Sequence, residues 1–482
     1  MAENIIKQIQ NIMREDAGVD GDAQRLSQIV WMLFLKIFDD QERQYELIDP
    51  KYKSPLPEEL RWRNWAVDSE GITGDELLDF VNNKLFKILK EFSYGSKDNP
   101  RGFIIQQVFQ DTYNYMKSGT LIRQVLNKLN EADFNRKEDR HQIGLLYEYM
   151  LKQLQSAGNA GEFYTPRPLT QFVVEMTDPK LGEKVFDPAC GTGGFLTSAL
   201  EYIRSKEVKT REDEKKLQNS LWGVELKQLP HMLAITNMIL HGVETPTRIT
   251  RDDSLSQPLR DIGPNDRVNV IFANPPFGGT VRAGTEMNFP QEFRTKETAD
   301  LFLVLFIHYL KPGGRAGIVL PDGSLFGEGV KTKIKQKLLE ECNLHTIVRL
   351  PQGVFNPYAG VNTNLLFFTK GAAPSTSSGQ ATKEVWYYQL PLPEGMKQYT
   401  KNRGITFEEF EPVKKWWSNR KENEHAWKVS IAQVRERGYN LDFKNPNGGE
   451  AKEQKDPREL VEEIERKENE IGEILESMKK EI

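Results

Sequence analysis

The sequence predicts an α/β fold with a parallel sheet and helical crossovers, an all-helical domain before it and a helical tail after it. Three patterns support this prediction. Short apolar strand-like runs alternate with helix-like stretches from about 160 to 370, helical periodicity dominates residues 1–155, and one apolar stripe recurs near the C-terminus. At 482 residues the chain has room for two to four domains with ample cores.

Residues 1–155 are predicted to form a helical N-terminal domain, because apolar residues recur there at intervals of three and four. The most apolar window, 29–38, is too short to span a bilayer and is typical of the central helix of a bundle. Residues 1–20 are polar and acidic, so no signal peptide is expected. A helical extension of the next domain would explain the same spacing equally well.

Residues 156–440 are predicted to form the catalytic α/β domain. A strand-like run ends at Asp187, and a glycine-rich turn and a helix-like stretch follow. Glycines let backbone N–H groups approach a ligand closely, and Asp187 can accept hydrogen bonds beside them. The turn lacks the G-x-G-x-x-G pattern and the lysine of a P-loop, which disfavours hydride transfer and nucleotide hydrolysis.

Two further strand-like runs end in carboxylates. Glu225 ends the run 221–225, where an acidic residue suits the two hydroxyls of a ribose. Asp253 follows the next run and is placed to accept from an adenine amine. The charged stretch 205–218 lies between the run that ends at Asp187 and the run 221–225, and we expect it to form a surface helix.

The apolar run 269–273 ends at Asn274-Pro275-Pro276-Phe277. A buried strand that delivers a rigid turn is expected here. The turn offers a side-chain amide, backbone carbonyls and an aromatic face, which together hold a flat base and polarise its exocyclic amine. A simple strand-ending turn is the alternative. Further strands are expected at 316–320, 346–350, 364–368 and 385–388, with a solvated loop at 372–382.

In this order the motifs resemble the class I S-adenosylmethionine-dependent methyltransferases, within them the adenine-N6 DNA methyltransferases, and most narrowly the modification subunits of type I restriction-modification systems. The resemblance covers nearly the whole chain and is carried by the segments 162–167, 187–196, 274–277, 354–364 and 438–442. It implies a Rossmann-like fold with a mixed seven-stranded sheet. Ala189 departs from the usual glycine, but alanine is small enough for cofactor binding to persist.

The resemblance implies a role for each residue of the 274–277 turn. The Asn274 side-chain oxygen and the Pro275 carbonyl would accept hydrogen bonds from the N6 amine of an adenine, and Pro276 belongs to the same rigid turn. Phe277 would stack on the base after its extrusion from the duplex. Catalysis would then be mostly positioning and electrostatics, so no general base is assigned.

The implied cofactor is S-adenosylmethionine. Glu225 would hold its ribose, Asp253 its adenine, and Thr192, Gly193 and Gly194 its methionine part. The other residues expected to bind or close over the cofactor are Glu162, Phe163, Tyr164, Thr165, Pro166, Arg167, Asp187, Ala189 and Gly191. The six histidines and two cysteines show no ligand spacing, so no metal is predicted.

The two cysteines, Cys190 and Cys342, are too few for a disulfide framework, which suits the cytoplasm. Cys190 lies inside the cofactor turn and invites comparison with the nucleophile of cytosine-C5 methylation. Its position in that turn places it at the cofactor and away from the base, which argues against a nucleophilic role.

A net charge of -5 and a pI of about 5.9 argue against tight DNA binding by this chain alone. The resemblance implies that a specificity subunit reads duplex DNA and that two copies of this chain work in each complex. Because this chain has no P-loop, a restriction or translocase subunit would supply any ATP-driven steps. No membrane partner is expected.

The loop 288–298 would touch the phosphate backbone, or else is a mobile loop without a ligand.

Residues 441–482 are predicted to form a C-terminal tail with an amphipathic helix from Pro457, whose apolar stripe includes Leu460, Ile464, Ile471 and Ile474. Such a stripe needs a partner. We expect helices of a specificity subunit, while packing onto its own chain remains the alternative.

Two other functions fit parts of the sequence. Protein-glutamine methyltransferases also use an Asn-Pro-Pro-aromatic turn, but they are usually much shorter. A non-catalytic assembly subunit is disfavoured by the intact 187–194 and 274–277 motifs.

Overall fold

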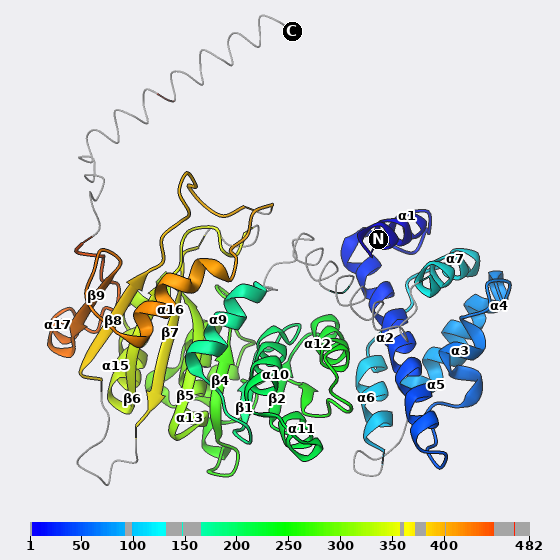
Figure 1. Cartoon of the computed structure of the whole chain (residues 1–482), viewed down its shortest axis with the longest axis horizontal. Helices are drawn as coiled ribbons and strands as arrows, with labels where there is room; N and C mark the ends of the chain where they lie inside the picture. Colours follow the sequence, from blue (N-terminus) through cyan, green and yellow to red (C-terminus); the bar gives the residue numbers. More distant parts are fainter. Residues whose placement is uncertain are drawn as a thin grey trace, which may run out of the picture.

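The computed structural model describes residues 2–91, 99–131, 147, 165–356, 361–371, 382–400, 402–447 and 467. Figure 1 shows a helical domain and an α/β domain side by side, with α12 (Gln228–Leu240) of the α/β domain facing the helical domain. The segment 162–164, the loop 372–381 and the tail helix from Pro457 lie outside the described residues, apart from Lys467. In the described ranges, no helix is both long and apolar enough to cross a bilayer.

The helical domain is built around one long helix. Its members are α1 (Ala2–Arg14), α2 (Gly21–Ile48), η1 (Glu58–Leu60), α3 (Trp62–Trp65), α4 (Gly74–Asp79), η2 (Phe80–Leu85), α5 (Phe86–Lys90), α6 (Pro100–Phe109) and α7 (Gly119–Asn130). Trp31, Phe34 and Phe38 of α2 are fully buried, and α2 contacts both α3 and α12. The predicted central helix and the helical character of the domain are therefore confirmed.

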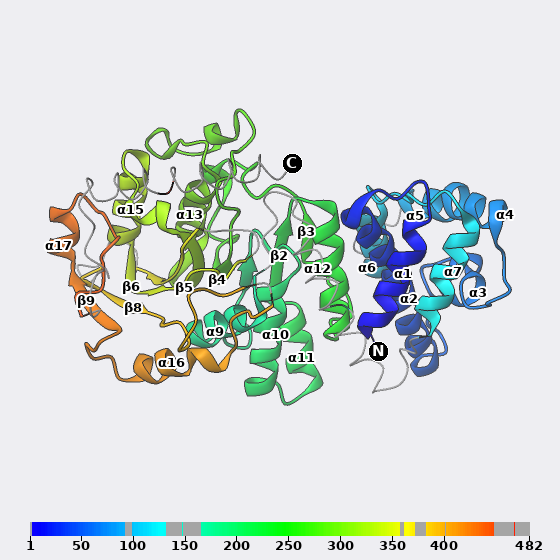
Figure 2. The same cartoon turned by 90° about the horizontal axis from the view of Figure 1, so that it is seen from above.

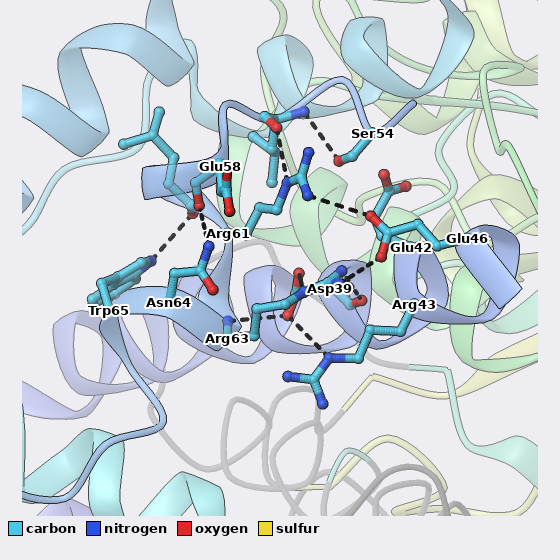
Figure 3. A network of polar contacts seen from close by, with 12 residues as sticks. Asp39, Glu42, Arg43, Glu46, Ser54, Glu58, Arg61, Arg63, Asn64 and Trp65 are labelled. Atoms are coloured by element: carbon cyan, nitrogen blue, oxygen red, sulfur yellow. Dashed lines mark hydrogen bonds and ion pairs between the residues drawn. The ribbon is translucent and has the colours of Figure 1, made fainter. Parts of the chain in front are cut away.

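A network of arginines and carboxylates fastens the segment after α2 back onto that helix (Figure 3). Asp39 is buried and accepts hydrogen bonds from the backbone N–H and the Nε of Arg63, at 3.0 and 2.9 Å. Glu46 pairs with Arg63 at 2.6 Å and with Arg61 at 3.4 Å. Because a buried carboxylate is costly without partners, these contacts fix α3 against α2.

The α/β domain holds one mixed sheet, in the order β3-β2-β1-β4-β5-β7-β6-β8-β9. The strands are β1 (Val185–Asp187), β2 (Leu221–Glu225), β3 (Ile249–Arg251), β4 (Val268–Ala273), β5 (Leu310–Pro321), β6 (Cys342–Arg349), β7 (Thr363–Lys370), β8 (Glu384–Gln389) and β9 (Ala426–Ser430). The strands β3, β2, β1, β4 and β5 are parallel neighbours, while β7 runs antiparallel to both β5 and β6.

The predicted mixed sheet is confirmed, but the count of seven strands is wrong for the described chain. β8 pairs with β6 in parallel and β9 pairs with β8 antiparallel, so two strands extend the edge beyond β6. The expected strands at 316–320, 346–350, 364–368 and 385–388 all fall within or overlap β5 to β8. The surface helix expected at 205–218 is present as α11 (Arg211–Gln218).

Alternating strand residues supply cores on both faces of the sheet. Val270 and Phe272 of β4 join a hydrophobic cluster with α9 (Arg167–Thr177), α10 (Gly194–Glu207), α12 and α16 (Glu411–Ser418). Ile271 and Ala273 join the opposite cluster with α13 (Thr298–Tyr309), α15 (Val330–Glu341) and α17 (Ile431–Glu436). Figure 2 shows α13 and α15 on one side of the sheet and α9, α10 and α16 on the other. The smaller helical turns are η3 (Leu259–Asp261), η4 (Thr285–Asn288), η5 (Gln291–Phe293), α14 (Asp322–Phe326) and η6 (Glu408–Phe410).

The first residues assigned to the tail pack on the α/β domain. Leu441 is buried, and its carbonyl accepts a hydrogen bond from the Tyr387 hydroxyl at 3.0 Å. Arg349 at the end of β6 pairs with Asp442 at 2.7 Å and donates to the Phe443 carbonyl at 2.9 Å. The domain boundaries at 155/156 and 440/441 remain predictions, but the structure attaches residues 441–443 to the sheet.

Polar contacts join the two domains. Arg101 of α6 pairs with Glu42 of α2 at 2.5 Å and donates to the Glu244 carbonyl beyond α12 at 3.0 Å. Arg251 at the end of β3 pairs with Asp111 of the helical domain. The hydrophobic cluster on the α12 side of the sheet also continues into α2 and α6. The helical domain is therefore a bundle with its own central helix that packs against the β3 edge of the sheet.

We expect Arg101→Met to lower the free energy of unfolding by about 3 kcal/mol, because it leaves the fully buried Glu42 carboxylate without its cation. Urea denaturation at neutral pH measures this change. Lys128→Met, which removes a solvent-exposed pair with Glu131, is the matched control and should cost less than about 1 kcal/mol. Equal effects of the two substitutions would contradict this assignment.

Candidate cofactor pocket and catalytic turn

A narrow pocket lies at the carboxyl ends of β1 and β4, where the glycine-rich turn meets the start of α9. Its lining residues are Thr165, Asp187, Ala189, Cys190, Gly191, Thr192, Gly194, Phe195 and Asn274. Carboxyl ends of parallel strands share one edge of a sheet, which is where ligands of open α/β folds bind. The structure thus brings six of the predicted cofactor residues together with one residue of the predicted catalytic turn.

The glycine-rich turn after β1 is set by backbone geometry. Gly191 and Gly193 have φ values of +53° and +79°, in the left-handed region that side chains with a Cβ rarely adopt. A Cβ on Gly191 would meet no atom within 4 Å, so the surface there is open for a ligand to approach the backbone. The Asn237 side chain of α12 donates to the Thr192 carbonyl at 3.0 Å, so this helix helps to hold the turn in place.

Glu225 at the end of β2 ties this turn to the next strand. One carboxylate oxygen accepts from the Gly191 N–H at 2.9 Å and the other accepts from the Lys227 N–H at 2.8 Å. Asp253 accepts from the Leu255 N–H at 2.9 Å, and the neighbouring Ser254 hydroxyl donates to the Pro188 carbonyl at 2.6 Å. Neither Glu225 nor Asp253 lines the pocket, so their contacts with a ribose and an adenine remain predictions.

Asp187 is the acidic side chain that lines the pocket. Only 1% of it is exposed, and this burial raises the pKa of its carboxyl to about 8. The hydrogen bond from the Ala189 N–H, at 3.1 Å, opposes that rise in pKa, while the nearby Glu225 carboxylate adds to it. A cation bound here would stabilise the ionised carboxylate and lower its pKa.

Asn274 presents an unused acceptor to the pocket. Its Nδ2 donates to the Thr165 Oγ1 at 3.0 Å, and its Oδ1 is buried with no donor among the described residues. Such a buried oxygen costs about 1–3 kcal/mol when it stays unpaired. The next residue, Pro275, is also buried, and the Phe277 ring lies edge-on to Phe355 at a centroid distance of 6.1 Å. The turn therefore offers an acceptor and an aromatic ring at one strand end.

Arg167 points away from the pocket. Its guanidinium donates to the Thr197 hydroxyl of α10 at 2.5 Å, pairs with Glu201 at 3.0 Å and contacts His241 at 3.1 Å. The structure therefore does not bring Arg167 to the predicted cofactor group. Pro166 immediately precedes α9 and does not line the pocket either.

Sequence reasoning missed two residues at the site. Phe195 lines the pocket at the start of α10, and its place directly after the glycines was the available signal. Asn237 supports the turn from α12, which no local pattern shows.

The thiol of Cys190 lies in surroundings that make it unreactive. It is 5% exposed, and burial together with the nearby Asp187 and Glu225 carboxylates raises the pKa of the thiol well above its usual value. A thiolate nucleophile is therefore disfavoured. Among the described residues, no cluster of histidine, cysteine and carboxylate side chains has the arrangement of a metal site.

We expect Cys190→Ala to keep the activity that the sequence motifs predict, methyl transfer, within about threefold of the unchanged protein, since alanine removes one buried sulfur and no reacting group. Initial rates at saturating cofactor test this. A loss of activity by two orders of magnitude, with the fold intact by circular dichroism, would restore the nucleophile hypothesis.

Comparison with known proteins places the chain in a family. The family model for the N-6 DNA methylase matches residues 138–455, and the model for the HsdM N-terminal domain matches residues 2–129. The type I restriction enzyme EcoEI methylase subunit of Escherichia coli is 56% identical over 478 residues, covering 98% of this chain and 95% of that protein. The chain belongs to the methylase subunits of type I restriction enzymes.

Solved structures agree with this assignment. The methylase subunit resembles a crystal structure of a modification subunit of a putative type I restriction enzyme from Vibrio vulnificus YJ016, with a TM-score of 0.82 and 44% identity over 92% of this chain and 96% of that one. A structure from work on complex assembly and conformational transition of the type I R-M system gives a TM-score of 0.80 at 38% identity, over 99% of this chain and 97% of that one. The predicted identity as a type I modification subunit, an adenine-specific DNA methyltransferase, is confirmed.

Proposed function

We propose that this methylase subunit transfers a methyl group from S-adenosylmethionine to N6 of an adenine flipped out of duplex DNA. The observation that supports this most strongly is the buried Oδ1 of Asn274, which has no donor among the described residues, at a pocket that the buried Asp187 also lines. An acceptor of this kind suits an exocyclic amine, and a buried carboxyl suits a cationic cofactor.

The residues of the turn act on the base by position. The Asn274 Oδ1 and the Pro275 carbonyl accept hydrogen bonds from the two N6 hydrogens, which directs the nitrogen lone pair towards the methyl donor. Phe277 supports the ring of the extruded base. Favouring a pyramidal nitrogen in this way lowers the barrier without a covalent intermediate or a strong general base. The cofactor supplies the electrophilic methyl group.

The pocket residues fit S-adenosylmethionine. Asp187 faces a position where a cationic group is favoured, and the open backbone at Gly191 admits the methionine part. Glu225 would hold the ribose from the end of β2, where its two oxygens also accept from the N–H groups of Gly191 and Lys227 at 2.9 and 2.8 Å. Leu226 beside it offers apolar surface for a base.

We further propose that a specificity subunit selects the DNA sequence, that a restriction subunit joins the complex, and that two methylase subunits work per assembly. The net charge of -5 supports reliance on a partner for DNA binding. Phosphate contact by residues 288–298 belongs to the same proposal. That loop is anchored through the buried Phe289 and Phe293, and Arg294 donates to the Phe289 carbonyl at 3.1 Å.

Transfer of labelled methyl from S-adenosylmethionine to duplex DNA tests the proposal, with and without a co-expressed specificity subunit. We expect label on DNA in the presence of that partner and little label without it. Label on protein glutamine in the same reaction mixtures would favour the protein-methyltransferase alternative. No label on DNA in the complete complex would contradict the proposal.

A further inference from the structure

Thr165, two residues before α9, holds the side chain of the catalytic asparagine. Thr165 lies 109 residues before Asn274 in sequence, yet its Oγ1 accepts a hydrogen bond from the Asn274 Nδ2 at 3.0 Å. Both residues line the pocket, and 91% of Asn274 is buried, since its exposed fraction is 9%. The hydroxyl of Thr165 therefore binds the nitrogen end of the Asn274 amide, and the Oδ1 at its other end is buried with no donor among the described residues.

An amide has two ends of similar shape and opposite hydrogen-bonding character. With the nitrogen bound to Thr165, the oxygen is left as an acceptor, which is the end that an adenine amine needs. If the amide turned over, its NH2 group would meet the NH2 group of the base, and two donors would face each other. A threonine hydroxyl can accept from an amide nitrogen or donate to an amide oxygen, so the bond to Thr165 fixes where the amide lies. The amine of the base then favours the arrangement in which the oxygen faces it.

The chain directly after Thr165 is fixed by contacts of Arg167 with α10 and with His241 at the end of α12. Arg167, two residues further along the chain, donates to the Thr197 hydroxyl at 2.5 Å and pairs with Glu201 at 3.0 Å. His241 lies 3.2 Å from the other oxygen of Glu201. Burial raises the pKa of Glu201, but the hydrogen bond to His241 and the nearby Arg167 outweigh it and bring that pKa below its usual value. The anchoring carboxylate thus stays ionised.

We propose that Thr165 is a positioning residue that holds the Asn274 amide in place at the pocket, with Arg167 and Glu201 fixing the start of α9, which begins two residues after Thr165. This inference rests on the proposed function, because it assigns the Asn274 oxygen to the adenine amine. Thr165 then both lines the pocket and holds Asn274. Arg167 acts through the start of α9 and does not need to contact the cofactor.

The test is Thr165→Val, which keeps the shape of the side chain and removes the hydroxyl, measured in the complex with the specificity subunit. We expect kcat to fall roughly tenfold, the loss of about one oriented hydrogen bond, while the Kd for S-adenosylmethionine changes by less than about threefold. Thr165→Ser, which keeps the hydroxyl, should restore kcat to within about threefold. Arg167→Leu should lower kcat in the same way with the Kd again unchanged.

Thr177→Val at the other end of α9 is the matched control. It removes a buried hydroxyl that bonds only within the helix, to the Val173 carbonyl at 2.8 Å, and should leave kcat unchanged. A raised Kd for S-adenosylmethionine with an unchanged kcat in Thr165→Val would overturn the inference and leave Thr165 as a cofactor contact alone. Equal loss of kcat in Thr165→Val and Thr177→Val would also overturn it. Absence of N6 methylation by the unchanged complex would instead refute the proposed function.

Discussion

Asn274→Ala is expected to lower kcat for DNA methylation by roughly a thousandfold while S-adenosylmethionine still binds. The substitution removes the buried acceptor on which the amine would be held, whereas the residues around Asp187 and the glycine turn are untouched. Single-turnover methyl transfer and calorimetric titration with the cofactor measure the two quantities separately.

Asn219→Ala is the matched control for this substitution. Asn219 is an exposed amide that follows α11 and donates to the Lys215 carbonyl at 2.9 Å, far in sequence from the turn. It should leave both quantities unchanged. If Asn274→Ala kept a tenth or more of the activity, the amide would not be the principal holder of the amine.

The affinity for S-adenosylmethionine is expected to rise with pH up to about 8, because the pKa of Asp187 is about 8 in the cofactor-free chain. Below that pH the carboxyl is protonated, so binding a cation there must release a proton, and the affinity rises by up to about tenfold per pH unit. Above about pH 8 the carboxylate is already ionised, and this contribution levels off.

Asp187→Asn provides the comparison for the pH series. It should weaken binding by roughly a hundredfold at about pH 9, where the native carboxylate is charged, and should remove the part of the slope that Asp187 contributes. Any slope that remains in Asp187→Asn belongs to the cofactor's own amine. Parallel curves for the two proteins, measured by calorimetry from about pH 6 to 9, would show that Asp187 does not titrate on binding.

Local motifs predicted the main supports of the site. The run to Asp187 with its glycines gave strand, turn and helix, and the run to Asn274 gave a buried strand that stops at two prolines, which have no N–H to donate. Both predictions depend on a few adjacent residues whose backbone preferences are strong. The pairing of these two strand ends in one pocket followed from the parallel sheet.

Contacts between segments that are distant in the sequence could not be predicted from local motifs. The bond between Thr165 and Asn274 spans 109 positions, and the direction of Arg167 depends on how α9 packs against α10. The count of seven strands came from the family resemblance, and both β8 and β9 extend the sheet beyond it. The sequence predicted β8 but not β9, because Ala426–Ser430 is a short run that carries a lysine and shows no strong alternation. It becomes a strand only because the edge of β8 is available to pair with it.

Identification of the methylated base tests most directly whether the turn at Asn274 holds the N6 amine of an adenine. DNA methylated by the complete complex is digested to nucleosides, and the modified base is identified by mass spectrometry. We expect N6-methyladenine as the product, absent when the complex carries Asn274→Ala and present when it carries Asn219→Ala. Methylation of cytosine, or N6-methyladenine that persists at full level in Asn274→Ala, would contradict it.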